Sequence, residues 1–189
     1  PTNPAMQKRL FNLDAPESPF NKGVIRYTAT GGFDETQEAF KNILKCEGFD
    51  TSKLHVTVTD GGSTGMELLI MGVCGPAGTD EKPLMMIDPA YTNYISFAER
   101  VGRKTATVKR HLNEDGKFSL PEIDKIEEII KANNPGALLV IPYDNPTGQL
   151  YDKETLMSLA KLCVKYNMWM VSDEAYRELY YVEGSELVS

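Results

Sequence analysis

Short apolar runs that alternate with helix-forming segments constrain the fold of this chain more than any other feature. Two runs are apolar at nearly every position: PLMMID at residues 83–88 and ALLVIP at residues 137–142. Such runs are typical of parallel strands that are covered on both faces. Parallel strands need long crossover connections, which helices supply. The sequence therefore predicts an α/β fold with a mostly parallel, doubly wound sheet between two layers of helices.

Other segments extend this alternation along the chain. Further strands are expected where β-branched and apolar residues cluster, at residues 55–59, 104–110 and 168–173. Helices are expected where apolar residues recur at helical spacing, after Asp34, after residues 61–65, after residue 88, after Glu122 and after Asp152.

Cap residues mark three of these helix starts. Asp34 followed by Gln37, and Ser119 followed by Glu122, match the capping-box pattern. Asp152 is expected to cap its helix alone. The first of the three helices carries an apolar stripe of Ala39, Phe40, Ile43 and Leu44.

Composition narrows the class of protein. The chain has 189 residues, a net charge of −7 and 41% hydrophobic residues. Clustered basic residues for nucleic-acid binding are missing, and no apolar run approaches the roughly 20 residues of a membrane span. Cys46, Cys74 and Cys163 are expected to fill the core without disulfides, which indicates a reducing compartment such as the cytoplasm. His55 and His111 lie far apart without companion ligands, so no metal site is expected.

Polar or glycine-rich segments follow three of the predicted strands. They are GGSTG at residues 61–65, NPTG at residues 145–148 and DEAY at residues 173–176. Each has an ordinary structural explanation, as a turn or a helix cap. The carboxyl ends of parallel strands nevertheless share one edge of a sheet, where ligands bind in such folds. The glycine turn could hold a phosphate through backbone N–H groups at a helix start.

Together, the order and spacing of these segments resemble the class I and II aminotransferases, which are pyridoxal phosphate enzymes of fold type I. The resemblance is to the N-terminal portion of aspartate aminotransferase-like members, from about Phe11 onward. By this resemblance Gly62, Ser63 and Thr64 bind the cofactor phosphate. Tyr91, which by itself is a core or helix-start aromatic, stacks on the pyridine ring.

The resemblance also assigns three catalytic residues. The Asn145 amide and the Tyr176 hydroxyl contact the phenolic oxygen of the cofactor, and Asp173 pairs with the protonated ring nitrogen. A carboxylate there makes the ring a stronger electron sink. In the family the Asn145–Pro146 peptide is commonly cis, so the NPTG segment is expected to be both a turn and a ligand site.

A dimer and a division of the chain follow from the same resemblance. Tyr27 is similar to a tyrosine that reaches the phosphate of the neighbouring subunit, so a homodimer is expected. Alone, Tyr27 would be a strand or turn aromatic. Residues 1–33 are expected to form an N-terminal arm near the dimer interface, and residues 34–189 the N-terminal part of the cofactor-binding large domain.

One element of the family pattern does not occur. The lysine that holds the cofactor as a Schiff base is expected beyond Asp173, but the last lysine of the chain is Lys165. The arginine that grips the substrate carboxylate has no counterpart either. The chain is therefore interpreted as a fragment of a larger enzyme, inactive alone.

Several functions remain open from the residues themselves. The first is transfer of an amino group between an amino acid and a 2-oxo acid, with aspartate and 2-oxoglutarate only a family-level expectation. A lyase or decarboxylase of the same fold would use the same cofactor site. A noncatalytic module could keep the pocket without the lysine. A nucleoside triphosphatase is disfavoured because no phosphate-binding loop with its lysine occurs.

Overall fold

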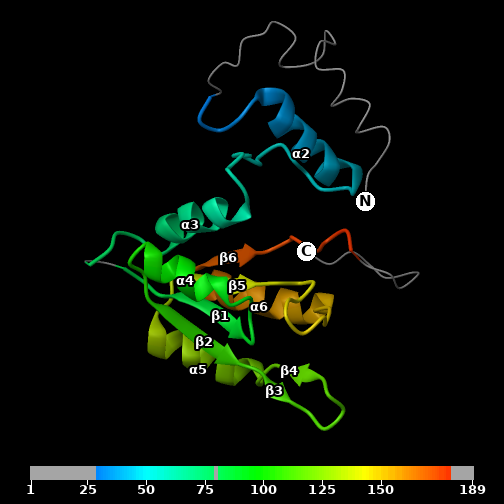
Figure 1. The fold of residues 1–189 in the computed structure, drawn as a ribbon. Helices are drawn as coiled ribbons and strands as arrows, with labels where there is room; N and C mark the ends of the chain where they lie inside the picture. The colour runs from blue at the N-terminus through cyan, green and yellow to red at the C-terminus, as the bar shows by residue number, and fades with distance from the viewer. Residues whose placement is uncertain (1–28, 79–80, 180–189) are drawn as a thin grey trace, which may run out of the picture. The chain divides into compact units, whose positions relative to one another are not determined.

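The computed structural model describes residues 29–78 and 81–179 (Figure 1). The chain divides after Thr59 into two compact units. The prediction of an arm ending at residue 33 stays a prediction, and Tyr27 lies outside the described residues. No helix in the described ranges is long and apolar enough to cross a membrane.

The first unit contains the expected helix, but its start differs from the prediction. Helix α2 spans Asp34–Cys46, and Phe33 rather than Asp34 occupies the N-cap position. Gln37 does not form a capping box, because its side-chain amide donates to the carbonyls of Gly31 and Gly32 at 3.1 and 3.3 Å. None of the α2 residues is buried in the described structure, so the predicted apolar stripe has no core to face there.

The strand predicted at residues 55–59 is wrong. These residues adopt no regular secondary structure. The Val58 N–H donates to the Gly31 carbonyl at 3.0 Å, yet no adjacent strand in the described part of this unit continues the pairing. Alternating β-branched residues favour a strand only when a partner supplies the rest of the ladder.

The second unit is built on a four-stranded parallel sheet. Its strands are β1 (Leu84–Asp88), β2 (Thr105–Lys109), β5 (Ala137–Val140) and β6 (Trp169–Ser172). The spatial order is β2-β1-β5-β6, and every neighbouring pair is parallel. All four strands predicted for this part of the chain are therefore confirmed.

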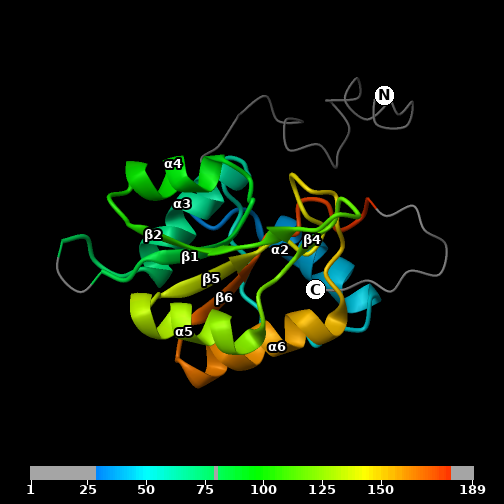
Figure 2. The ribbon, with the colours of Figure 1, turned by 90° about the horizontal axis from the view of Figure 1, so that it is seen from below.

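Helices cover both faces of this sheet. Figure 2 shows α3 (Gly62–Val73) and α4 (Asn93–Arg100) on one face, and α5 (Ile123–Asn133) and α6 (Lys153–Lys165) on the other. Side chains alternate along β1: Leu84 and Met86 pack in the cluster with α3 and α4, whereas Met85 and Ile87 pack with α5 and α6. This two-sided burial explains the continuous apolar runs and confirms the predicted doubly wound α/β fold.

The order of the strands creates a switch point between β1 and β5. From β1 the chain continues to β2 on one side, and from β5 it continues to β6 on the other. The connections after these two central strands therefore diverge, which opens a crevice at their carboxyl ends. Residues 89–92 and 141–148 lie at this crevice.

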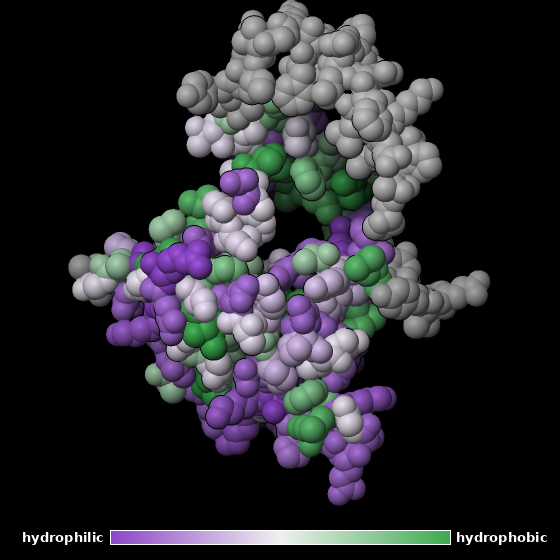
Figure 3. All heavy atoms as spheres, in the orientation of Figure 1, coloured by the Kyte–Doolittle hydropathy of each residue, from purple (hydrophilic) through white to green (hydrophobic). Residues whose placement is uncertain are grey.

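A small antiparallel hairpin replaces one predicted cap. Strands β3 (His111–Leu112) and β4 (Phe118–Ser119) pair, and the Ser119 hydroxyl donates to Asn113 at 3.2 Å. Helix α5 begins after Glu122, as predicted, but no side chain caps it. The predicted Ser119 capping box is wrong because the hairpin engages the Ser119 side chain. Figure 3 shows a small hydrophobic group surrounded by hydrophilic residues on the hairpin.

Asp152 does cap α6, because its carboxylate accepts the Thr155 N–H at 2.7 Å.

The cysteines divide between core and surface. Cys74 and Cys163 are buried, as expected, and burial raises the pKa of the Cys163 thiol to about 11. Cys46 is exposed, so its predicted place in the core is wrong. It lies on α2, where the helical pattern is not buried in the described structure.

Two glycines provide a test of the packing of this unit. A Cβ atom at Gly136 would lie 2.3 Å from the Val73 carbonyl oxygen, whereas a Cβ at Gly72 in α3 would meet nothing within 4 Å. Gly136→Ala is expected to lower the free energy of unfolding by about 1–3 kcal/mol, because backbone must shift to admit the methyl group. Gly72→Ala is the matched control, and it is expected to leave stability unchanged or raise it by up to about 1 kcal/mol. Urea unfolding of the full-length protein measures both, and equal effects would contradict the close approach of β5 to α3.

Candidate active site

A cavity of about 550 Å³ lies at the carboxyl edge of the sheet. Its lining comes from α3, from the segment after β1, from α4, from the segment after β5, and from the end of β6 with the turn that follows it. Six of the residues predicted for the site line this cavity: Gly62, Ser63, Tyr91, Asn145, Asp173 and Tyr176. The topology thus brings together segments that are far apart in the sequence.

The start of α3 presents backbone to the cavity. Gly61 occupies the N-cap position at φ 87°, a conformation that favours glycine, and no side chain caps the helix there. A Cβ atom at Gly62 would meet nothing within 4 Å, so the approach to this backbone is open. Thr64 points elsewhere, since its hydroxyl donates to the Asp60 carbonyl at 3.2 Å and it does not line the cavity. The N–H groups of a helix start attract anions.

Asp173 follows the last residue of β6 and is fixed from three directions. Its N–H donates to the Val140 carbonyl at 2.9 Å, which continues the pairing of β6 with β5. One carboxylate oxygen accepts the Ala175 N–H at 2.9 Å, and the other accepts the Tyr94 hydroxyl. The carboxylate is therefore locally capping and also held at the cavity wall, so the two interpretations of Asp173 from sequence are compatible.

Tyr94 is the site residue that sequence reasoning missed. Tyr94 lies on the packing face of α4 and is only 1% exposed. Burial, followed by the hydrogen bond to Asp173, raises the pKa of its hydroxyl above the ordinary value. A buried phenol needs a partner for its hydroxyl, which was the available signal. The identity of that partner depends on the packing of α4 against the end of β6.

Tyr91 and Tyr94 meet at the cavity. Their rings contact edge to face, with centroids 5.5 Å apart and planes at 82°. Tyr91 is 38% exposed, and its hydroxyl accepts a hydrogen bond from the Asn93 amide at 2.7 Å. A buried ring behind it and a hydrogen bond at its tip hold Tyr91 at the wall of the cavity.

The turn after β5 carries Asn145 to the same cavity. The Asn145–Pro146 peptide is cis, as expected, and the Asp88–Pro89 peptide is cis as well. Gly148 closes the turn at φ 71°, and its N–H donates to the Asp144 carbonyl at 2.8 Å. Tyr176 lies on the turn after β6 and is 41% exposed.

This donor set fits a phosphorylated pyridine. A helix start open to anions, an exposed aromatic ring, an amide and a carboxylate all line one cavity. Among residues 29–78 and 81–179, no three His, Cys, Asp or Glu side chains gather as a metal site would require.

Known proteins share this architecture. The curated relatives include a probable aspartate aminotransferase of Methanocaldococcus jannaschii, 29% identical over 170 residues, which are 89% of this chain and 43% of the relative. Aspartate aminotransferase from Thermus thermophilus with maleate superposes with a TM-score of 0.73 at 27% identity, covering 90% of this chain and 42% of that one. A C–S lyase from Staphylococcus hominis, bound to pyridoxal phosphate, superposes with a TM-score of 0.75 at 22% identity, covering 89% and 41%.

These comparisons define the class and then the family. The fold is that of the large domain of fold type I pyridoxal phosphate enzymes, of which this chain holds part. Residues 16–187 match the family described as aminotransferase class I and II, and the chain belongs to that family. The chain spans less than half the length of the relatives described here.

The raised pKa of Tyr94 gives a pH-dependent prediction. An ordinary tyrosine has a pKa of about 10, so in the unfolded chain Tyr94 ionises above that pH while in the folded protein it stays neutral. The stabilisation from the buried neutral hydroxyl is thus present below about pH 10 and is lost as the pH rises towards the folded-state pKa. In ultraviolet titrations, the folded wild type and Tyr94→Phe are expected to form equal numbers of phenolates up to about pH 11. In urea the variant is expected to form one fewer. A difference of one phenolate in the folded state below that pH would contradict the burial of this hydroxyl.

Proposed function

We propose that this chain forms the N-terminal part of a pyridoxal phosphate-dependent aminotransferase, which transfers an amino group between an amino acid and a 2-oxo acid. The proposal includes the cofactor roles given above for the cavity residues. Residues 1–33 act as an arm at a homodimer interface, with Tyr27 reaching the partner's phosphate, and residues 34–189 belong to the large domain. The cytoplasm is the proposed compartment.

One observation carries this proposal: Asp173 shares its cavity with the open helix start of α3. The carboxylate accepts hydrogen bonds from Tyr94 and Ala175, which fix its direction. The helix start and Asp173 provide an anion-binding end and an anionic end in one cavity of about 550 Å³. A phosphorylated pyridinium needs both ends, because its phosphate is negative and its ring nitrogen is positive.

The chemistry of the site follows from these charges. Bound pyridoxal phosphate supplies an electron sink for charge that develops at the α-carbon of an amino acid. Asp173 would favour the protonated ring nitrogen of the bound cofactor by charge attraction. Tyr94 keeps the Asp173 carboxylate in place from behind. Tyr91 would stack on the cofactor ring, and the Asn145 amide would bind its phenolic oxygen.

Cofactor binding by the full-length protein tests the proposal directly. Pyridoxal phosphate is added, and its absorbance is followed before and after borohydride reduction. Cofactor that becomes fixed to the protein on reduction is expected, together with amino-group transfer to a 2-oxo acid. Release of ammonia or carbon dioxide instead would assign lyase or decarboxylase chemistry. Reversible binding without fixation would indicate a noncatalytic module.

Asp173→Asn tests the role of the carboxylate. The amide keeps the shape of the side chain but carries no charge, so kcat/KM for amino transfer is expected to fall about 100-fold or more. Asp152→Asn is the matched control, because it makes the same chemical change at the α6 cap, where asparagine also caps well. Steady-state kinetics of both variants decide the matter. Equal activity of Asp173→Asn and Asp152→Asn would contradict the role assigned to the Asp173 carboxylate.

A further inference from the structure

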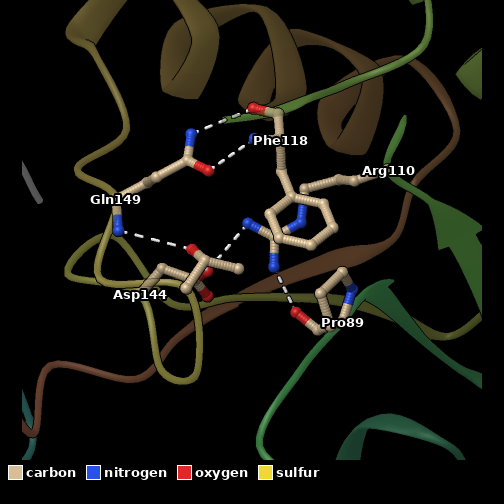
Figure 4. Close-up of polar contacts among 6 residues, drawn as sticks. Pro89, Arg110, Phe118, Asp144 and Gln149 are labelled. Atoms are coloured by element: carbon tan, nitrogen blue, oxygen red, sulfur yellow. Dashed lines mark hydrogen bonds and ion pairs between the residues drawn. The ribbon is translucent and has the colours of Figure 1, made fainter. Parts of the chain in front are cut away.

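A buried ion pair lies beside the candidate site without lining it. Arg110 Nη1 donates to Asp144 Oδ2 at 2.8 Å, and the two side chains are only 3% and 2% exposed (Figure 4). Neither residue is among those that line the cavity. None of the functional roles above uses this pair, although two buried charges are costly unless their geometry and hydrogen bonds compensate them.

Arg110 joins the two turns at the switch point. It follows the last residue of β2, and its own N–H donates to the Asp88 carbonyl at 2.8 Å. Its second terminal nitrogen, Nη2, donates to the carbonyl of Pro89, two residues before Tyr91. Nη1 reaches Asp144, the residue before Asn145. One guanidinium thus binds both the segment that carries Tyr91 and the turn that carries Asn145.

The partners of the pair are themselves held in place. Asp144 also accepts the Thr147 hydroxyl, which belongs to the same turn. The guanidinium carbon of Arg110 lies 5.5 Å from the centre of the Phe118 ring, and Figure 4 shows the ring over the guanidinium. The Gln149 side chain fixes Phe118, since it accepts the Phe118 N–H at 2.7 Å and donates to the Phe118 carbonyl at 2.9 Å. Phe118 of the hairpin therefore packs against the buried guanidinium of the ion pair.

We propose that Arg110 and Asp144 are positioning residues, which fix the Tyr91 segment and the Asn145 turn relative to each other. The Tyr91 ring and the Asn145 amide are then both correctly placed to contact one cofactor molecule. This inference rests on the proposed function, because Tyr91 and Asn145 need a bound cofactor to be positioned against. Arginine suits the task, since its rigid fork serves two acceptors at once, whereas a lysine ammonium is a flexible point charge.

If the ion pair served stability alone, replacing it with apolar residues would leave the geometry of the bound cofactor unchanged. Replacing both members of a buried ion pair by apolar residues is often neutral or stabilising. The double variant Arg110→Met with Asp144→Leu is therefore expected to fold with nearly unchanged melting temperature, yet to lose the bridge between the two turns. A role in positioning appears only in the geometry of the bound cofactor. Circular dichroism induced in the cofactor absorption band reports that geometry independently of turnover.

The experiment adds pyridoxal phosphate to the full-length protein in four forms. They are the wild type, the double variant, Arg110→Lys, and a control in which the exposed pair Lys125 and Glu128 is replaced by Met and Leu. The double variant is expected to lose most of the induced dichroism per bound cofactor, and kcat is expected to fall about 10-fold or more. Arg110→Lys is expected to lose part of the signal, and the control none.

Each other outcome has a defined meaning. Wild-type dichroism in a folded double variant overturns the positioning role while leaving the proposed function intact. If the double variant does not fold, Arg110→Lys decides, and an unchanged signal there overturns the proposal. Failure of both variants to fold assigns the pair to stability alone and likewise overturns it. A wild type that binds no pyridoxal phosphate refutes the proposed function, and this inference with it.

Discussion

The second unit depends on burial of its parallel sheet from both faces. Strands β1 and β5 lie at the centre of the sheet. Their side chains belong to one apolar cluster on the face covered by α3 and α4 and to another on the face covered by α5 and α6. Polar chemistry has little room within such strands, because an unpaired polar group in an apolar core is costly. It is therefore concentrated where the strands end. Gly62, Asn145 and Asp173 therefore lie at the carboxyl edge of the sheet and not within its strands.

Two carboxylates at this edge show how environment separates their roles. Asp144 is buried and paired with Arg110, so its charge is balanced within the protein. Asp173 is only partly buried, lines the cavity and accepts hydrogen bonds from Tyr94 and Ala175. A neutral donor orients a carboxylate without cancelling its charge, whereas an arginine balances it. Asp173 thus remains available to a cationic ligand, and Asp144 serves the surrounding structure.

The same cavity also explains how one turn combines two interpretations of its sequence. The NPTG segment is a turn closed by Gly148, and it also presents Asn145 to the cavity. Backbone hydrogen bonds fix the turn, which leaves the Asn145 side chain available for a ligand. Residues that stabilise the turn and residues that face the ligand are therefore different members of one short segment.

Apolar periodicity determined the four parallel strands and the four helices of the second unit from sequence alone, but not the β3–β4 hairpin. Runs such as residues 83–88 become strands because only two-sided burial suits them, and Asp152 caps its helix because that hydrogen bond is local. Local patterns failed where a distant partner decides the outcome. No described strand of the same unit continues the pairing of residues 55–59, Ser119 is engaged by a hairpin, and Cys46 lies on a helix with no buried residue in the described structure. Only the tertiary structure brings Tyr94 to Asp173 and Arg110 to Asp144, across 79 and 34 residues. The spatial order of the strands, rather than distance along the chain, decides which side chains meet.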